Sequence, residues 1–261
     1  MPSHTEKKGS LAIVGLGPGR REYMTARALK AIARADYVIG NASYLEPLEP
    51  LLAGKNVIRS SMGKEVERAQ QAIDLAKIHV VAIVSGGDAG VYGMASIVLE
   101  VLEHSGIEID VEVIPGVTAA NAGASTLGSP LSGDFAVISL SDLLTPLEVI
   151  EQRLEAVFSV GIPVVLYNPR SRGRPYNFAV AIEHARKYLP PETPVALVKN
   201  ALRDKDEEKI VTMLKDIEQV MDQVDMHTTV FIGGNESRIW RMGNNVKGII
   251  TPRGYHRKYV Y

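Results

Sequence analysis

Short apolar runs alternate along the chain with longer segments in which apolar residues recur every three or four positions. The short runs are typical of buried β-strands, and the longer segments are typical of amphipathic α-helices. In the first half of the chain, this pattern predicts strands at 11–16, 37–39, 57–58, 79–84 and 109–114, and helices at 22–34, 65–77 and 92–104. Because the helices connect successive strands, we expect a mostly parallel, buried sheet.

A turn-rich segment at 127–133 separates this half from the second, so we place a boundary between two domains there, 1–128 and 129–261. Beyond it, the pattern predicts strands at 135–140, 163–167, 195–199, 209–213 and 228–233, and helices at 147–160, 177–189 and 214–221. We expect 228–233 to be the last strand. The fold class that follows is α/β, in two α/β domains.

Composition narrows the classes of protein that the chain can represent. Hydrophobic residues make up 46% and charged residues 23%, which is typical of a globular protein. The 29 Lys and Arg against 30 Asp and Glu leave a net charge of −1, so we expect no nucleic-acid partner. There is no cysteine, and the six histidines lack metal-ligand spacing, so we expect no metal site.

Two segments bear on location. The uncharged stretch 113–133 is interrupted by prolines and glycines, so we expect no membrane segment. The first ten residues are polar and lack the apolar region of a secretion signal. Together they predict a cytoplasmic protein.

Glycines follow the first predicted strand and precede a helix, where bare backbone can approach a ligand. A dinucleotide-binding turn is disfavoured, because the spacing is G-x-G-x-G and Pro18 lacks the N–H that a pyrophosphate needs there. Asp36, the acid that would bind the ribose, lies at the beginning of its strand instead of the carboxyl end. No Lys-Ser/Thr follows the glycines, which excludes a P-loop. A tight turn without a ligand stays open as the alternative.

The segment SGGDAGVYG, 85–93, follows the most apolar strand, and open α/β sheets bind ligands at the carboxyl ends of their strands. Four glycines surround Asp88, so this loop can wrap part of a ligand and place the carboxylate near a cationic group or hydroxyls. The alternative, equally weighted, is that Asp88 caps the following helix. Thr118 offers a hydroxyl after the fifth strand, although capping of the next helix is its commoner role.

Three arginines follow the strand at 163–167, in a loop that also contains Gly and Pro. Solvation at the surface is the ordinary role of such a cluster. A carboxylate-rich substrate would also use Arg170, Arg172 and Arg174, because a guanidinium binds a carboxylate through two hydrogen bonds.

Four segments taken together resemble a known family. In chain order they are VGLGPG, ADYVIGNASYL, SGGDAGVYGM and IPGVTAANAGASTLGSPL, which are similar to segments of the S-adenosylmethionine-dependent tetrapyrrole methyltransferases of corrin synthesis. The resemblance covers roughly 11–233. Many members have Gly-Asp-Pro where this chain has Gly87-Asp88-Ala89. That variant, with SPLSGDFAVISLSDLLTP, VVLYNPRSRGRP and ALVKNALRDKDE, resembles the branch that methylates C17 of precorrin-3B or cobalt-precorrin-3.

The resemblance implies two α/β domains with S-adenosylmethionine, the methyl donor, in the cleft between them, a tetrapyrrole substrate and a homodimer. It assigns donor binding to loops and strand ends of both domains: Pro18, Gly86, Gly87, Asp88, Val91, Tyr92, Thr118, Ala119, Tyr167, Asn168, Ala196 and Thr228. Substrate binding is assigned to Gly17, Gly19, Arg170 and Arg172. Ring contraction, which accompanies C17 methylation in this branch, needs an acid or a base. Asp88 is the catalytic candidate, and Lys199 and His227 stay open for that role.

Two alternative functions stay open. One is a related methyltransferase that acts on another corrin position, or on a protein in diphthine synthesis. The other is a non-catalytic adenosyl-binding module. A donor-dependent gain of one CH₂ in a tetrapyrrole distinguishes catalysis from binding alone.

Overall fold

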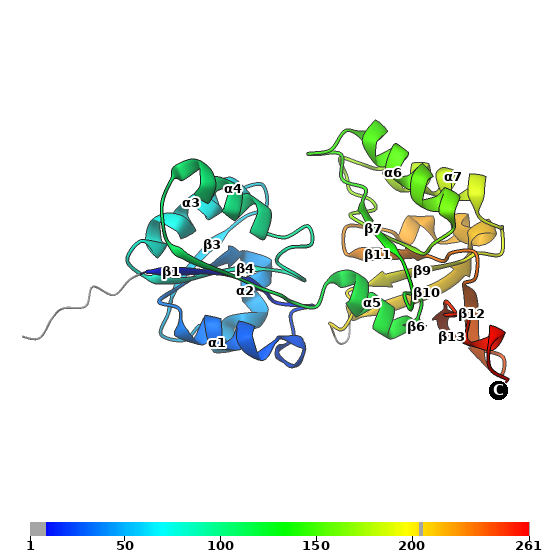
Figure 1. Ribbon diagram of the computed structural model, residues 1–261, viewed down its shortest axis with the longest axis horizontal. Helices are drawn as coiled ribbons and strands as arrows, with labels where there is room; N and C mark the ends of the chain where they lie inside the picture. The colour runs from blue at the N-terminus through cyan, green and yellow to red at the C-terminus, as the bar shows by residue number, and fades with distance from the viewer. Residues whose placement is uncertain (1–8, 204–205, 261) are drawn as a thin grey trace, which may run out of the picture. The chain divides into compact units, whose positions relative to one another are not determined.

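The computed structural model describes residues 9–203 and 206–260. The chain forms two compact units, Met1–Ala119 and Ala120–Tyr261 (Figure 1). The helix α5 (Ala119–Leu127) packs with the second unit, so the division lies one helix before the expected boundary at residue 128. At Gly123, the backbone of this helix lies directly against the second sheet, because a Cβ there would come within 2.6 Å of the Phe231 ring. The contact joins residues that are far apart in the sequence. The turn residues at 127–133 therefore could not indicate to which unit this helix belongs.

In the described part of the first unit, a five-stranded sheet has the order β3-β2-β4-β1-β5, and all its pairings are parallel, as expected. The strands are β1 (Ser10–Gly15), β2 (Tyr37–Asn41), β3 (Asn56–Ser60), β4 (Val80–Ser85) and β5 (Asp110–Ile114). Val14 of β1 lies opposite both Val84 of β4 and Ile114 of β5. These three strands therefore end at the same level, and their following loops begin side by side.

Helices cover both faces of this sheet (Figure 1). They are α1 (Ala26–Arg34), α2 (Ala42–Leu45), α3 (Glu65–Ala76) and α4 (Ala95–Ser105). Buried residues of α3 and α4 form one apolar cluster with the sheet, and those of α1 and α2 form another. Two of the helices begin later than predicted. The Oγ1 of Thr25 accepts a hydrogen bond from the N–H of Ala28 at 3.1 Å, which begins α1 after a 3-10 turn, Arg21–Tyr23, and α4 begins only after the loop that follows β4.

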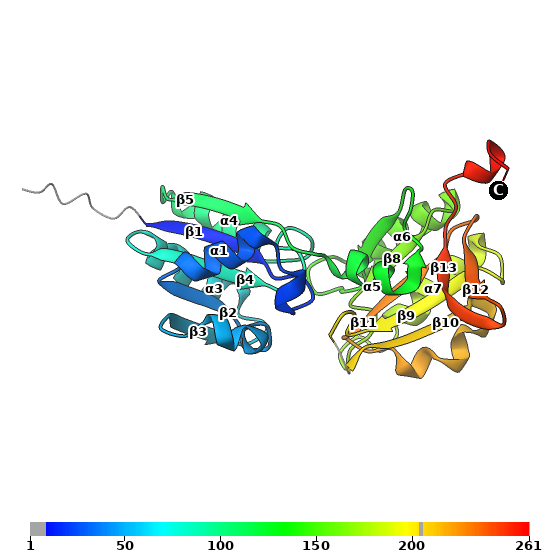
Figure 2. The same cartoon turned by 90° about the horizontal axis from the view of Figure 1, so that it is seen from below.

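The second unit has a mixed sheet in the order β10-β9-β11-β8-β7, in which only β7 and β8 are parallel among the described strands (Figure 2). Its strands are β7 (Ala136–Ser139), β8 (Val164–Tyr167), β9 (Pro194–Lys199), β10 (Glu208–Met213) and β11 (Thr228–Ile232). The helices α6 (Leu147–Val160) and α7 (Asn177–Tyr188) cover one face, where their apolar residues pack in one cluster with the sheet. The other face packs against α5.

The end of the chain differs from the prediction. Residues 214–221 were predicted as one helix, but they form 3-10 turns, Leu214–Gln219 and Met221–Gln223. Two further strands, β12 (Arg238–Met242) and β13 (Asn245–Ile250), follow the strand predicted to be the last. They form a hairpin whose short turn includes Gly243 at φ 59°. The second of them also pairs with β6 (Gly128–Ser129), a partner more than a hundred residues earlier in the chain.

Within residues 9–203 and 206–260, none of the helices combines the length and the apolar character that a membrane crossing requires.

Candidate functional site

The loops that follow β1, β4 and β5 form one connected surface, which we call the glycine edge and define as residues 16–20, 86–94 and 115–118. Two of these loops join through a backbone bridge. The N–H of Gly17 donates to the carbonyl of Gly87, and the N–H of Gly87 donates to the carbonyl of Gly17, both at 2.9 Å. The bridge is of the antiparallel type and connects the loops that follow the parallel strands β1 and β4, so these two loops are held together by backbone hydrogen bonds.

Asp88 connects this bridge to the third loop. Its Oδ1 accepts hydrogen bonds from the N–H groups of Gly90 at 2.8 Å and Val91 at 3.1 Å, and its Oδ2 accepts one from the N–H of Gly116 at 2.9 Å. Helix α4 has Met94 at its N-cap, so Asp88 does not cap that helix, which was the alternative weighed from the sequence. The carboxylate therefore anchors two loops, and its acid or base role stays a prediction.

Several glycines of this region are needed because backbone meets backbone. A Cβ on Gly15 would lie 2.6 Å from the nitrogen of Gly116, and a Cβ on Gly116 would lie 2.3 Å from the carbonyl oxygen of Gly87. Such separations are far below van der Waals contact, so these positions exclude any side chain. Gly87 differs: it has φ 68°, and the nearest atom to a Cβ would be 3.9 Å away. Its backbone is therefore bare on one side.

The other predicted residues of the first unit lie on or next to the glycine edge. Pro18 is buried, and Gly19 is partly exposed at φ 115°. Val91 and Tyr92 are 38% and 60% exposed, and Tyr92 has φ 51°, which is uncommon for a residue with a side chain. Thr118 is partly buried and directly precedes α5. Exposed apolar side chains thus stand beside bare backbone.

Sequence reasoning missed one residue of this region. The ring of Tyr44, in the short helix α2, lies against Gly86, where a Cβ would be 2.7 Å from the ring. Asn41 positions that helix, because its Oδ1 accepts hydrogen bonds from the N–H of Ser43 at 2.9 Å and from its Oγ at 2.7 Å. The tyrosine stands in the segment ADYVIGNASYL, but nothing in the local pattern indicates that it reaches the loop after β4.

A second group of predicted residues lies where β7, β8 and β9 end and β11 begins. The hydroxyl oxygen of Tyr167 accepts the N–H of Ala120, in the first turn of α5, at 2.6 Å. The Nδ2 of Asn168, a residue with φ 51°, donates to the Oγ of Ser139 at 2.9 Å. Ala119, predicted to contact the donor, precedes Ala120 and begins the same helix. Tyr167 thus holds the helix start that follows the glycine edge in the chain.

Replacing Tyr167 with Phe removes this acceptor and should lower the free energy of unfolding by about 1 to 2 kcal/mol, because a helical N–H loses its partner. Urea unfolding of the two proteins measures the difference. Tyr188→Phe is the control, since the hydroxyl of Tyr188 donates to Glu155 at an exposed position. Equal stability of Tyr167→Phe and the parent would contradict the expected contribution.

Charged residues meet at the same end of the second sheet. The Nζ of Lys199 lies 2.7 Å from the Oδ2 of Asp225, whose Oδ1 accepts the N–H of His227 at 2.8 Å and the hydroxyl of Thr228 at 3.1 Å. Partial burial raises the pKa of Asp225, but the hydrogen bonds from Lys199, His227 and Thr228 outweigh it and hold the pKa below its usual range. The hydrogen bond with Asp225, together with its charge, raises the pKa of Lys199.

Asp225→Asn should therefore destabilise the protein in a pH-dependent way. The lowered pKa of Asp225 gives stability that is present above the unfolded value of about 3.9 and is lost as the pH falls through the folded value. The raised pKa of Lys199 gives stability that is present below about 10.4 and is lost as the pH rises through its folded value. We expect the gap in unfolding free energy between parent and variant to be widest between these limits. Denaturant unfolding across pH measures it, with Asp222→Asn as control because that carboxylate is fully exposed. A gap that does not change with pH would contradict the expectation.

The remaining predicted residues of the second unit differ in placement. Ala196 lies in the middle of β9, opposite Phe231, and is fully buried in the cluster under α5, so its side chain is away from the strand end. The Nη1 of Arg170 donates to the carbonyl of Met221 at 3.2 Å and lies 3.4 Å from Asp222. Arg172 is exposed. Of these two arginines, Arg172 presents its guanidinium more openly to an anionic substrate.

Among the described residues, neither metal-ligating groups nor the two hollows of the first unit add to these two groups. The part of the chain with assigned placement contains no group of three or more His, Asp or Glu residues that could hold a metal ion. Two shallow hollows of the first unit lie along α4 and α3, and the residues that line them are not those of the glycine edge. The candidate site thus rests on the strand-end loops.

Comparison with known proteins identifies relatives along most of the chain. The family described as Tetrapyrrole (Corrin/Porphyrin) Methylases matches residues 10–218. A probable cobalt-factor III C(17)-methyltransferase of Salmonella typhimurium is 44% identical over 94% of this chain and 99% of its own length. The cobalamin biosynthesis protein CbiHC of Archaeoglobus fulgidus is 43% identical over 97% of this chain. The chain spans only 54% of that protein, about half of its length.

Solved structures share the fold. The crystal structure of the methyltransferase CobJ superposes with a TM-score of 0.85 at 32% sequence identity, and the match covers 94% of this chain and 100% of that one. The α/β architecture with two sheet-containing units, expected from the hydrophobic pattern, is therefore confirmed.

Proposed function

The chain belongs to the tetrapyrrole (corrin/porphyrin) methylases, and we propose that it transfers a methyl group from S-adenosylmethionine to C17 of precorrin-3B or cobalt-factor III in cobalamin biosynthesis. The observation that carries this proposal is the match, over nearly the full length of both chains, to a relative named as a cobalt-factor III C(17)-methyltransferase. The match covers 94% of this chain, and so it extends over both units.

The glycine edge has the features that an adenosyl donor needs. Gly19 and Gly87 have positive φ, and among the described residues beyond their chain neighbours the nearest atom to a Cβ on either is 3.8 Å away, so a ligand can approach the backbone. Val91 and Tyr92 offer exposed apolar and aromatic surface for a flat purine. The Asp88 carboxylate supplies negative charge for a cationic donor. These three features support donor binding at this edge.

When bound, the donor supplies a methyl group on a positively charged sulfur. The chain's own task is to hold the reacting carbon in line with that methyl group and to exclude water. Asp88 contributes by keeping the loops after β4 and β5 at a fixed separation through its three N–H donors. Rigid loops favour transfer, because a misplaced reactant costs rate even when it binds well.

The tetrapyrrole is a polyacid, and the arginine loop after β8 supports its binding. Arg172 is exposed, and the Nη1 of Arg170 has contacts of 3.2 and 3.4 Å with 221–222, so each guanidinium can bind a carboxylate of the substrate. Gly17 and Gly19 extend the predicted substrate set to the first unit. For ring contraction, Asp88, Lys199 and His227 stay the predicted acids and bases. The predicted homodimer is tested by sedimentation of the purified chain.

Incubation with ¹³C-methyl donor tests the proposed function. We expect precorrin-3B or cobalt-factor III to gain one CH₂ by mass spectrometry, and the label to appear on C17 by NMR. A label on another carbon would indicate a methyltransferase for a different corrin position. Binding of S-adenosylhomocysteine without any transfer to either tetrapyrrole would indicate a non-catalytic adenosyl-binding module.

A further inference from the structure

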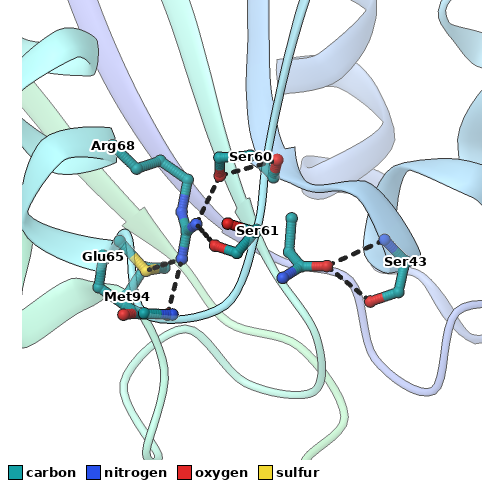
Figure 3. A network of polar contacts seen from close by, with 9 residues as sticks. Ser43, Ser60, Ser61, Glu65, Arg68 and Met94 are labelled. Carbon is teal, nitrogen blue, oxygen red and sulfur yellow. Dashed lines mark hydrogen bonds and ion pairs between the residues drawn. The ribbon is translucent and has the colours of Figure 1, made fainter.

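A buried arginine lies behind the glycine edge and has no part in the function described so far. Arg68 is in α3, and its side chain is only 4% exposed. Figure 3 shows its guanidinium between the end of β3 and Met94, the residue before α4. Moving a guanidinium out of water is unfavourable unless hydrogen bonds replace those to water. The groups that receive its hydrogen bonds therefore indicate what this residue does.

One nitrogen of the guanidinium holds the end of β3. The Nη1 of Arg68 donates to the Oγ of Ser60 at 2.6 Å and to the carbonyl of Ser61 at 3.2 Å. The Oγ of Ser60 in turn donates to the carbonyl of Gly40, in β2, at 3.4 Å. This side of the network joins the carboxyl ends of two neighbouring strands.

The other nitrogen holds the start of α4. The Nη2 of Arg68 lies 3.4 Å from the sulfur of Met94 and 3.4 Å from the Oε1 of Glu65, which balances the charge (Figure 3). Met94 is the N-cap residue of α4 and is itself buried. The Nε of Arg68 finds no partner within the described part of the chain. An apolar residue would serve stability alone at least as well, because a buried ion pair often adds little net stability.

Met94 is coupled to Asp88 by tight backbone packing. The N–H of Ala95 donates to the carbonyl of Ala89 at 2.9 Å, and a Cβ on Gly93 would lie 2.5 Å from the carbonyl oxygens of both Asp88 and Ala89. The two ends of the segment 88–95 are therefore in direct backbone contact, and we expect a shift of Met94 to move Asp88. Because Asp88 also accepts the N–H of Gly116, that shift reaches the loop after β5 as well.

We propose that Arg68 is a positioning residue for the methyl donor: through Met94, it sets the place of the 86–94 loop. The inference rests on the proposed function, because the position of this loop affects methyl transfer only if the donor binds at the glycine edge. A planar guanidinium can hold Ser60 and Met94 at once in one geometry. A lysine places one ammonium on a flexible stem and cannot span both groups in the same way.

Arg68→Lys, which keeps the charge, is the principal test. We expect its dissociation constant for S-adenosylhomocysteine, measured by titration calorimetry, to rise by about fivefold or more. The KM for the donor should rise in parallel, and kcat at saturating donor should fall by a smaller factor than the KM rises, because the variant mainly reduces donor binding while Asp88 and its hydrogen bonds are kept. Hydrogen exchange should become faster at the N–H groups of Gly90 and Val91, and unchanged in α7.

A second variant and a control separate positioning from general destabilisation. Met94→Leu removes the sulfur that accepts from Arg68 at nearly constant volume, and it should weaken S-adenosylhomocysteine binding in the same direction. Ile73→Val shortens a fully buried side chain of the same helix that carries no hydrogen-bonding group, so it leaves the polar contacts of Arg68 in place, and it should retain parental affinity while losing stability.

The outcomes are distinguishable. Parental affinity in both Arg68→Lys and Met94→Leu overturns the positioning role, and so does an equal loss of affinity in Ile73→Val. A parent protein that binds no S-adenosylhomocysteine contradicts the proposed function instead. Parental binding that is weakened in Arg68→Lys and Met94→Leu but kept in Ile73→Val supports both.

Discussion

Asp88→Ala should reduce affinity for S-adenosylhomocysteine and methyl-transfer turnover by at least about tenfold, since three backbone hydrogen bonds are lost together. The N–H groups of Gly90, Val91 and Gly116 all donate to this carboxylate. Without it, the loops after β4 and β5 lose their connection, and the glycine edge loses the negative charge that favours a cationic donor. Calorimetry with S-adenosylhomocysteine and a labelled-methyl transfer assay measure the two effects.

Asp88→Asn separates the contribution of the hydrogen bonds from Gly90 and Val91 from that of the hydrogen bond from Gly116. The amide oxygen can still accept from Gly90 and Val91, but the amide nitrogen cannot accept the N–H of Gly116. We expect an intermediate loss of affinity, with tighter binding than in Asp88→Ala. Asp74→Asn is the matched control, because Asp74 is ion-paired to Lys77 at an exposed position of α3. Parental affinity and turnover in Asp88→Ala would show that the anchoring role assigned to Asp88 is wrong.

Gly116→Ala should disrupt the glycine edge by adding a methyl group where there is no space, whereas Asp88→Ala removes hydrogen bonds. The new Cβ would lie 2.3 Å from the carbonyl oxygen of Gly87 and 2.7 Å from the carbonyl carbon of Gly15. Backbone atoms cannot rotate away as a side chain can, so the loops must separate. We expect a loss of about 1 to 3 kcal/mol in the free energy of unfolding, typical of overpacking. Affinity for S-adenosylhomocysteine should fall as well.

Gly133→Ala is the matched control for this change. Within the described part of the chain, and apart from its own neighbours, Gly133 has no atom within 4 Å of a Cβ, and its φ is outside the left-handed region. The same substitution should therefore leave affinity unchanged and unfolding within about 0.5 kcal/mol of the parent. Denaturant unfolding and calorimetry measure both variants side by side. If Gly116→Ala matched Gly133→Ala in both measurements, the contact between the three loops could not have the importance given to it here.

Much of the candidate site in the first unit can be predicted from local patterns. An apolar run that ends in Gly-Leu-Gly-Pro-Gly or in Gly-Gly-Asp indicates a buried strand followed by a loop with bare backbone. Parallel strands place such loops at one edge of the sheet. For that reason, the three loops of the glycine edge were expected, and the structure places them together.

Individual contacts inside the site were not predictable. Asp88 was weighed as a ligand-binding residue or a helix cap, whereas its Oδ2 accepts the N–H of Gly116, 28 positions later in the chain. Arg68 looks like one charged residue among several in an amphipathic helix, yet it is buried against Ser60 and Met94. Strand order and register decide which residues meet across the loops. Neither can be read from the local periodicity of apolar residues.

By itself, the amino-acid sequence determined the α/β class, most of the strands, and the glycine-rich loops that follow them, because burial imposes a repeating pattern on neighbouring residues. The tertiary structure alone decided that α5 belongs to the second unit, that β13 pairs with β6, and that Tyr44 reaches Gly86. The physical reason is the separation along the chain of the residues that interact. A strand or helix is selected by its own few residues, but the partner across a sheet or loop is selected by packing among segments that are distant in the chain.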